Sequence, residues 1–403
     1  DRAVRRRFVS HGQLTNGSDT RYRAIGHDRP VFAFSADLGR VSAAPATVPL
    51  VIGQVRTPAV SYLGRGLAPL WTAYFPGWRE MLGFFSADVT AARGRADQLD
   101  SRITADARAA GGEAYAGLCA ISLRQAYGGA ELVAGPHGRP WAFLKEISSD
   151  GNVSTVDVLY PASPAWLYAD PAYLGHLLEP LLAYAEAGGW PRRYAEHDLG
   201  SAYPDATGHN DGIEGRIAHS VNLALKGIIA IAAMGQIATA GDHGHYARIA
   251  RRYMSFWLAH ARDPDGRHLD LAYDRDDRDD GTWGTVYNAY ADRLLGTGLV
   301  PRAIQAEQAA WYSSMIRQFG LPLQVPHRYA KTDWEMFTAA WLSDYPIKDQ
   351  LIHRVFAYAN TTPSRAPFSD LYDTTTSRRV RFRARPVQGG IFALLALHGG
   401  ARH

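Results

Sequence analysis

The chain of 403 residues contains a single cysteine, Cys119, so it can form no intrachain disulfide and no zinc site built on several thiolates. The longest apolar stretch, near residues 228–234, is far shorter than the roughly 18 residues of a membrane-spanning helix. The N-terminal segment DRAVRRRF is basic but has no apolar segment behind it, so no signal peptide is expected. The sequence therefore predicts neither a disulfide scaffold nor a membrane protein.

Several common catalytic and binding motifs are also missing. The sequence contains no G-x-S-x-G, no H-E-x-x-H, no Walker A motif and no dinucleotide fingerprint between a strand and a helix. The net charge is +4, with arginines gathered at both ends, but no nucleic-acid reader motif accompanies them. We therefore expect no nucleic-acid partner and no cofactor, and the histidine spacings match no standard metal site.

What is present is an ordinary globular composition, with 46% hydrophobic and 20% charged residues, and a length that suits about two domains. Residues 1–75 are predicted to be β-rich, because 30–39 and 48–63 combine β-branched and aromatic residues between glycine and proline. They are interpreted as the C-terminal part of a β-sandwich-like domain, or as an edge layer on the next domain. Residues 76–403 are predicted to form a second, mainly helical domain.

Helical periodicity dominates the second domain. Apolar residues recur at helical spacing, and Gly or Pro separates most of the segments. The predicted helices are 78–111, 112–132, 171–188, 219–239, 243–261, 301–318, 333–343 and 347–359. Long helices without intervening βαβ units favour a helical array over a doubly wound sheet.

One polar segment interrupts these helices and is the first candidate site. Residues 141–164 are predicted to form a β-hairpin around an Asp-Gly-Asn turn. Its polar side chains are Lys145, Glu146, Ser148, Asp150, Asn152 and Asp157. In a strand, Glu146 and Ser148 share a face, which would place a carboxylate beside a hydroxyl. The alternative is a polar turn that carries a glycosylation sequon at Asn152.

The second candidate site is a long loop with two clusters of histidine and acid. The first is His197-Asp198 and the second is His209-Asn210-Asp211. Histidine beside a carboxylate suits proton transfer near neutral pH. The alternative is that the acids are turn or cap residues and that the histidines pack beside aromatic side chains.

Two further segments carry candidate ligand-binding residues. Asp333 and Trp334 stand at a predicted helix start, and an aromatic ring beside a carboxylate suits a polar ligand, sugars included. Arg385 precedes Gly389-Gly390, and a guanidinium there could hold a ligand carboxylate in a bidentate manner. Arg385 could equally close the fold through an internal ion pair.

Six motifs in one order resemble the extracellular glutaminase A family of fungi and bacteria. They are FLKEISSDGNVSTVDVLYPASP, HDLGSAYPDATGHNDG, NLALKGIIAI, KTDWEMFTAAW, PFSDLYDT and RARPVQGG, and PVFAFSADLG and SLRQAYGGAEL are similar to the family as well. The resemblance runs from about residue 8 to about 397. It departs from the family after Gly212, where a stretch of roughly 50 to 70 residues, about one helical hairpin, is absent.

The resemblance implies a secreted protein with a mainly α fold. Its helical domain would be an α/α toroid of the six-hairpin glycosidase type, short of one hairpin and preceded by a partial β-sandwich-like segment. The implied activity is hydrolysis of L-glutamine to L-glutamate and ammonia. A missing hairpin would leave apolar helix faces exposed.

Amide hydrolysis needs an activated nucleophile and a proton donor for the departing ammonia. We assign the acid and base work to Glu146 or Asp150, with His197 or His209 as proton carrier. Ser148 is a candidate nucleophile, and a water activated by a carboxylate is the alternative. Lys145 and Arg385 are expected to hold the substrate carboxylate; the remaining predicted substrate contacts are Asn152, Asp157, Asp211 and Trp334.

Two other functions fit the same fold. An inverting glycoside hydrolase would use two carboxylates, Asp150 or Asp198 with Asp333, flanked by Trp334 and Trp283. A carbohydrate-binding protein without chemistry would have the aromatic groups but no acid and base pair. All three hypotheses require a small polar ligand, and all require the Asp-Gly-Asn turn and the His-Asp loop to meet.

Overall fold

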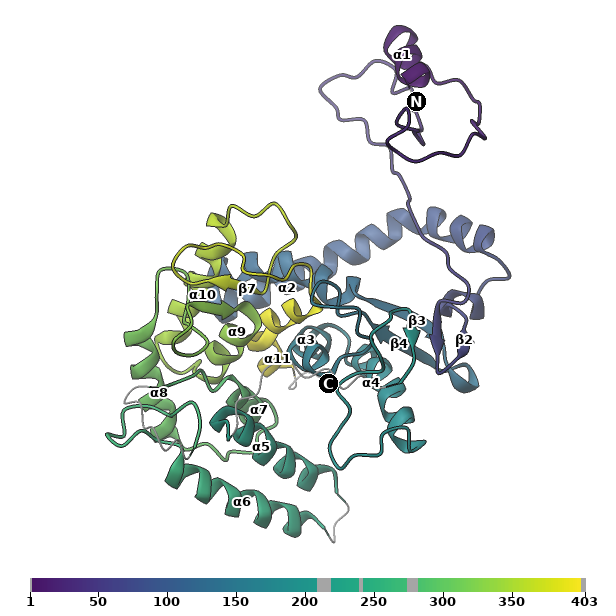
Figure 1. Cartoon of the computed structure of the whole chain (residues 1–403). Helices are drawn as coiled ribbons and strands as arrows, with labels where there is room; N and C mark the ends of the chain where they lie inside the picture. Colours follow the sequence, from purple (N-terminus) through teal and green to yellow (C-terminus); the bar gives the residue numbers. More distant parts are fainter. Residues whose placement is uncertain (1, 209–218, 239–241, 274–281, 400–403) are drawn as a thin grey trace. The chain divides into compact units, whose positions relative to one another are not determined.

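A computed structural model of the protein describes residues 2–208, 219–238, 242–273 and 282–399 (Figure 1). The chain divides into two compact units, Asp1–Gln54 and Val55–His403. The predicted domain boundary near residue 75 remains a prediction. Within the described residues, no helix is both long and apolar enough to cross a lipid bilayer.

The first unit contains helix α1 (Arg2–His11) and, in its described residues, no strand. The strands predicted at 30–39 and in the first part of 48–63 are therefore wrong. A strand needs a neighbouring strand for its N–H and C=O groups, and none pairs with these segments. Their aromatic side chains Phe32 and Phe34 are exposed and contact each other edge to face.

The sheet portion of the fold consists of short strands in the second unit. They are β1 (Val60–Tyr62), β2 (Arg65–Leu67), β3 (Ala130–Ala134), β4 (Pro140–Leu144), β5 (Asp205–Ala206), β6 (Tyr329–Lys331) and β7 (Leu371–Asp373). The pairs β1–β2, β3–β4 and β6–β7 are antiparallel, and β1–β5 is parallel. Because β6 pairs Lys331 with Leu371, the polar residues next to these two positions come close together.

Helices make up most of the second unit. They are α2 (Trp78–Gly128), α3 (Val156–Ala169), α4 (Pro171–Glu186), α5 (Val221–Ile237), α6 (His243–His260), α7 (Tyr290–Leu294), α8 (Arg302–Met315), α9 (Thr332–Trp341), α10 (Ile347–Thr361) and α11 (Ala393–Gly399). Short 3-10 helices are η1 (Leu70–Ala73), η2 (Pro136–Gly138), η3 (Tyr287–Ala289) and η4 (Pro386–Phe392). The predicted long helices are confirmed, except that the one predicted at 112–132 ends at Gly128 and residues 130–132 belong to β3; α3 and α7 were not predicted as helices.

The break that the sequence predicts at residue 111 is present inside α2. Gly111 and Gly112 have non-helical backbone angles, and the φ of Gly112 is 75°, a value that suits glycine. The half before the break buries only Ile103 and Ala107, whereas the half after it carries the other buried residues of α2. The second half of α2 therefore belongs to the helical ring, and the first half lies outside its core.

The ring is an α/α toroid with an inner and an outer layer of helices. The inner helices are α3, α5, α7, α9 and α11, and all ten residues of α9 are buried. The outer helices pack on them as hairpin partners, with α4 on α3, α6 on α5 and α10 on α9. One buried cluster joins α9 and α11 to the second half of α2 and to α5, and a second lies beneath β3, β4, α3 and α4.

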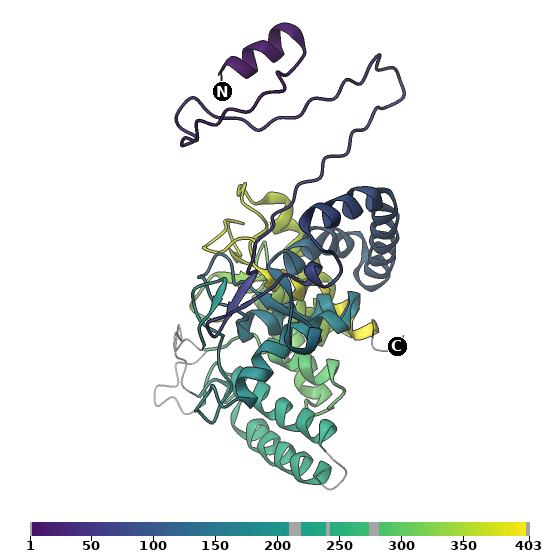
Figure 2. The same ribbon diagram turned by 90° about the vertical axis from the view of Figure 1, so that its right-hand side faces the viewer.

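The ring is open at one place. Around the described inner helices, α5 packs on α7, α7 on α9, α9 on α11 and α11 on α3, but α3 and α5 do not pack closely on each other. Apolar side chains are exposed on helices of both hairpins next to this opening: Leu182 on α4 and Leu223 on α5. Figures 1 and 2 show α5 and α6 side by side, and an apolar groove of about 600 Å³ is lined by both helices, with Tyr253 and Phe256 on α6. The exposed apolar faces agree with the expected loss of one hairpin after Gly212.

The hairpin predicted at 141–164 is wrong in its pairing. β4 pairs with β3 instead, and the segment after the turn becomes helix α3 from Val156 onward. Only an isolated bridge between Lys145 and Val153 remains of the expected ladder. Burial of α3 against η4 and α11 outweighs the strand propensity of its first residues, as tertiary packing often does.

Candidate functional site

The two segments that were expected to meet do so through their backbones. In the turn, the N–H of Glu146 donates to the carbonyl of Asn152 over 3.0 Å. Val153 then pairs with the His-Asp loop: its N–H donates to Gly200 over 2.8 Å, and its carbonyl accepts from Leu199 over 2.8 Å. The loop is thus fixed against the N-terminal end of α3.

A buried chain of charges lies beside this junction. The guanidinium of Arg385 donates from Nη2 to Glu146 Oε1 over 3.1 Å and from Nη1 to Asp370 Oδ2 over 3.0 Å. Lys331 Nζ lies 3.0 Å from Asp333 Oδ2 and 3.8 Å from Asp370 Oδ2. All five side chains are buried or nearly so. Three carboxylates therefore share two cations, and the group carries one excess negative charge when fully ionised.

Burial changes the acidity of two of these carboxyl groups. It raises the pKa of Asp333 to about 6, although the Lys331 ammonium acts in the opposite direction. It also raises the pKa of Glu146, against the hydrogen bond from Ser149 and the charge of Arg385. Asp333 Oδ1 is buried and has no hydrogen-bond partner within the described ranges of the chain. The Asp333 carboxyl can therefore gain or lose a proton near neutral pH.

His197 lies between two carboxylates at the edge of this group. Its Nδ1 is 2.7 Å from Asp198 Oδ2, and its Nε2 is 3.8 Å from Asp157 Oδ1. The hydrogen bond to Asp198 raises the pKa of His197, although partial burial of the ring opposes it. Asp198 is itself buried and accepts from Gly200 N–H and from Asn152 Nδ2. Asp198 thus fixes the ring, and Nε2 faces Asp157.

Asp157 is the accessible carboxylate of the site. It stands in the first turn of α3, and its side chain is 61% exposed, compared with 31% for His197. Tyr160 is three residues further on and shares that face of the helix. Lys226 of α5 places its Nζ 4.3 Å from the centre of the Tyr160 ring. A carboxylate, an imidazole and an ammonium are therefore brought to one end of the inner helices.

Aromatic rings form a layer beside these groups. Trp334 stacks on Tyr287 with ring centres 4.1 Å apart and lies 6.2 Å from Tyr160. Lys331 Nζ is 4.7 Å from the centre of the Trp334 ring. Burial raises the pKa of Tyr287, and the charges of Asp333 and Asp157 add to this effect. The Tyr287 hydroxyl therefore keeps its proton and can donate a hydrogen bond.

Other predicted residues lie at the border of the site. Asp150 is exposed and its carboxylate accepts from the N–H of Asn152, which is a turn role. Ser148 Oγ accepts from the N–H of Arg383 over 2.9 Å. Lys145 places its Nζ 5.5 Å from the centre of the Tyr203 ring. The roles assigned to Asp150, Ser148 and Lys145 remain predictions.

Further sequence-based expectations concern His209, Asp211, Trp283 and Asn152. His209 and Asp211 lie outside the described residues. Trp283 is buried against Trp311 and Tyr312, so it does not join Trp334 in one aromatic layer. Asn152 is buried and donates to Asp198, so its amide is not available for a glycan.

Sequence reasoning missed Asp370, Lys226 and Tyr160 as parts of the site. Asp370 and Lys226 lie within motifs that were used for the family resemblance, PFSDLYDT and NLALKGIIAI, whereas Tyr160 lies within the first candidate segment, 141–164. Lys226 is the one charged residue of its motif, which could have marked it, whereas Asp370 is one of two aspartates in its motif. Nothing in the local sequence indicates that Tyr160 supports the Lys226 ammonium.

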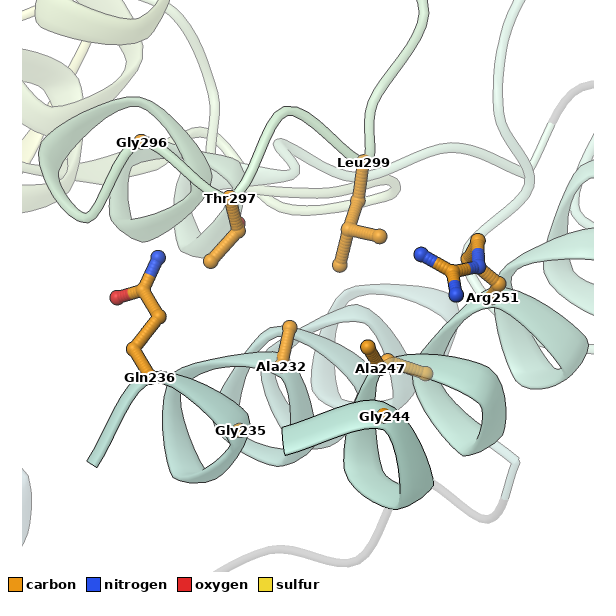
Figure 3. A pocket seen from close by; sticks show the side chains of 10 residues that line it. Ala232, Gly235, Gln236, Gly244, Ala247, Arg251, Gly296, Thr297 and Leu299 are labelled. Atoms are coloured by element: carbon orange, nitrogen blue, oxygen red, sulfur yellow. The ribbon is translucent and has the colours of Figure 1, made fainter. Parts of the chain in front are cut away.

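A pocket of about 360 Å³ elsewhere in the toroid does not contain the site (Figure 3). It is lined by Ala232 and Gln236 near the C-terminal end of α5, by Arg251 of α6 and by Thr297. Lys226 lies nearer the other end of α5. In the part of the chain that the structure describes, no group of three or more His, Cys, Asp or Glu side chains is placed to hold a metal ion.

Comparisons with known proteins give one consistent result. The family model described as the glutaminase A six helical-hairpin domain matches residues 112–216 and 211–395. A second family model, a domain of unknown function, matches residues 1–106. The two pieces of the first match meet at residues 211–216, just after Gly212, where the sequence indicated a deletion.

Two curated relatives match almost the whole chain. Glutaminase A of Aspergillus oryzae (strain ATCC 42149 / RIB 40) is 35% identical over 467 aligned positions, which cover 98% of this chain and 67% of that protein. A probable glutaminase of Arthroderma benhamiae (strain ATCC MYA-4681 / CBS 112371) is 28% identical, with 98% of this chain and 64% of that protein covered. The chain thus spans about two thirds of their length. The alignment of 467 positions exceeds the 403 residues of the chain, so at least 64 positions of the Aspergillus protein have no counterpart here.

Proposed function

The chain belongs to the glutaminase A family, and we propose that it hydrolyses the side-chain amide of L-glutamine to L-glutamate and ammonia. The names of the two relatives support this reaction class. The single structural observation that carries the proposal is His197, fixed by Asp198 and facing the accessible Asp157. Such an arrangement offers a proton donor and a proton acceptor at one solvent-accessible point.

The proposed reaction proceeds by attack of water on the amide carbon. Asp157 accepts a proton from the water as the new C–O bond forms. Protonated His197 then donates its Nε2 proton to the amide nitrogen as the C–N bond breaks, and ammonia leaves. Asp157 returns its proton to His197, whose Nε2 is 3.8 Å away, and the site is restored. The protonated hydroxyl of Tyr287 is the candidate donor to the developing oxyanion.

The buried charges have a supporting role in this proposal. Both carboxylate oxygens of Glu146 are occupied, since Oε1 accepts from Arg385 and Oε2 accepts from Thr155 over 2.8 Å. We therefore assign Glu146 to the positioning of Arg385 and of the N-terminal end of α3. The earlier hypothesis that Glu146 or Asp150 is the acid or base is tested by changing each to its amide.

The test measures ammonia release from L-glutamine by purified protein. His197→Gln and Asp157→Asn should each lower the rate by roughly 100-fold or more, the usual contribution of a general acid or base. His353→Gln is the matched control, because His353 is exposed on the outer helix α10. Full activity in both site variants would remove the assignment. Full activity in Glu146→Gln and Asp150→Asn would remove the hypothesis that Glu146 or Asp150 is the acid or base.

The aromatic layer supports a second candidate function. Tyr287, Trp334 and Tyr160 provide stacking surfaces of the kind that bind sugar rings, so a glycoside hydrolase on the same toroid is the alternative. Its carboxylates were predicted as Asp150 or Asp198 with Asp333. Release of reducing sugar from an oligosaccharide, without ammonia from glutamine, would favour this alternative. Sugar binding without release would favour a carbohydrate-binding protein. Secretion, which the resemblance implies, stays a prediction.

A further inference from the structure

Within the described ranges, Lys226 makes no ion pair, and the same holds for Lys145 at the border of the site. Among the described residues, its Nζ has no hydrogen bond or ion pair and rests only on the Tyr160 ring, 4.3 Å from the ring centre. The side chain is half-buried, and burial lowers the pKa of Lys226. The charge of Asp157 opposes this effect, but in the part of the chain that the structure describes no carboxylate lies at ion-pair distance from Nζ, and a ligand carboxylate would compensate for the lost hydration.

The two cations of the buried charge group are already engaged, and Lys145 lies over the Tyr203 ring at the border of the site. Arg385 donates to Glu146 and to Asp370 and is buried. Lys331 lies 3.0 Å from Asp333 and is largely covered. Neither Arg385 nor Lys331 can turn to a ligand without leaving a buried carboxylate unpaired, which is strongly unfavourable.

The position of Lys226 also suits a substrate contact. It lies over Tyr160, which shares a face of α3 with Asp157, so the ammonium and the proposed base are on the same side of that helix. In glutamine, three carbon atoms separate the α-carboxylate from the side-chain amide carbon. A ligand with its amide at Asp157 and His197 therefore has its carboxylate within reach of a long, flexible lysine side chain.

We propose that Lys226 holds the α-carboxylate of the substrate and thereby selects amino acids with a free α-carboxylate. This inference rests on the proposed function, because it deepens the description of the same site. It replaces the earlier expectation that Arg385 and Lys145 hold this group. Lys226 is a specificity residue in this proposal and takes no part in proton transfer.

Binding of the product and of a blocked analogue tests the assignment without any need for turnover. L-Glutamate has the free α-carboxylate, whereas in L-isoglutamine that group is an amide. Titration calorimetry should show that the unaltered protein binds L-glutamate roughly 10- to 100-fold more tightly than L-isoglutamine. Lys226→Met should remove this preference, and Lys226→Arg should keep most of it.

Controls separate the assignment from a general loss of structure. Lys348→Met is the matched control, because Lys348 pairs with Asp349 on the outer helix α10. It should bind both ligands as the unaltered protein does. If Lys226→Met does not fold, Lys226→Gln, which keeps a polar end, takes its place in the titrations.

Two results would overturn the assignment: a preference for L-glutamate that survives in the folded Lys226 variant, or no preference in the unaltered protein. Ammonia release from L-glutamine is measured on the same samples. A Lys226-dependent preference without ammonia release would remove the amidase proposal and leave the carboxylate site standing. Ammonia release together with equal binding of the two ligands would remove the carboxylate site and leave the amidase proposal standing.

Discussion

Arg385 Nη2 lies 3.1 Å from Glu146 Oε1, although 239 positions separate the two residues in the chain. Both side chains are buried. Because Arg385 stands before η4 and Glu146 after β4, the pair joins these two segments inside the toroid. Asp370 accepts from the other end of the same guanidinium. Arg385 therefore ties together three chain segments at the candidate site, which is the internal ion pair that the sequence left as an alternative to ligand binding.

Removal of Arg385 should destabilise the protein strongly. Arg385→Met would leave Glu146 and Asp370 buried with only Lys331 near them, and breaking a buried pair costs about 3–5 kcal/mol. Urea unfolding at neutral pH measures the loss. Arg383→Met is the control, because Arg383 is exposed two positions away. Equal stability of the two variants would contradict the role given to Arg385.

The alkaline limb of the activity profile should depend on Asp198. The hydrogen bond to Asp198 raises the pKa of His197, and the proposed donor must be protonated, so activity falls as pH rises through that raised pKa. Asp198→Asn should move the fall to lower pH. Ammonia release measured from pH 5 to pH 9 shows the shift, with the exposed Asp205→Asn as control. If activity in Asp198→Asn falls at the same alkaline pH as in the unaltered protein, His197 is not the proton donor.

The stability of the protein should depend on pH through Asp333. Burial raises the pKa of Asp333 to about 6, so the native state binds this proton more tightly than the unfolded chain. The contribution is most favourable below the unfolded pKa near 4 and is lost as pH rises toward about 6. Relative to Asp333→Asn, the unaltered protein should lose on the order of 3 kcal/mol over that interval.

Urea unfolding of both proteins at pH 4, 5, 6 and 7 measures this difference. Other carboxyl groups titrate in both proteins and cancel in the comparison. A difference in stability that is the same at every pH would show that Asp333 has an ordinary pKa.

A methyl group added at Gly390 should disturb the packing of η4 against Asp333. A Cβ at Gly390 would lie 2.7 Å from the Cβ of Asp333 and 2.8 Å from the carbonyl oxygen of Pro161. Gly390→Ala should therefore cost about 1–3 kcal/mol of stability. Gly83→Ala, in open space on the first half of α2, should be neutral or slightly stabilising. Thermal unfolding of the two variants separates these outcomes, and an equal melting temperature would show that η4 can move away.

Much of the helical architecture could be predicted from the sequence, because helices depend on local periodicity. The break at Gly111 and Gly112 is an example, since two adjacent glycines interrupt a continuous apolar pattern. The strand-like segment after Asn152 could not be assigned in this way. Its residues favour a strand locally, but α3 gains more by burial among η4 and α11.

The candidate site shows the same division. The His197-Asp198 contact could be predicted, since adjacent residues in a loop are close in any fold. The contacts of His197 with Asp157 and of Arg385 with Glu146 could not, because each depends on segments that are distant in sequence. That Lys226 makes no ion pair among the described residues is a still less local property, because it depends on where the fold places the carboxylates.

The sequence by itself determined the residue types, the helical segments and the family, since these depend on local order and on motifs along the chain. Only the tertiary structure decided which carboxylates are buried and which one is accessible. Burial and pairing are properties of the packed chain: they raise the pKa of Asp333, occupy both oxygens of Glu146, and leave Asp157 and Lys226 available to a ligand.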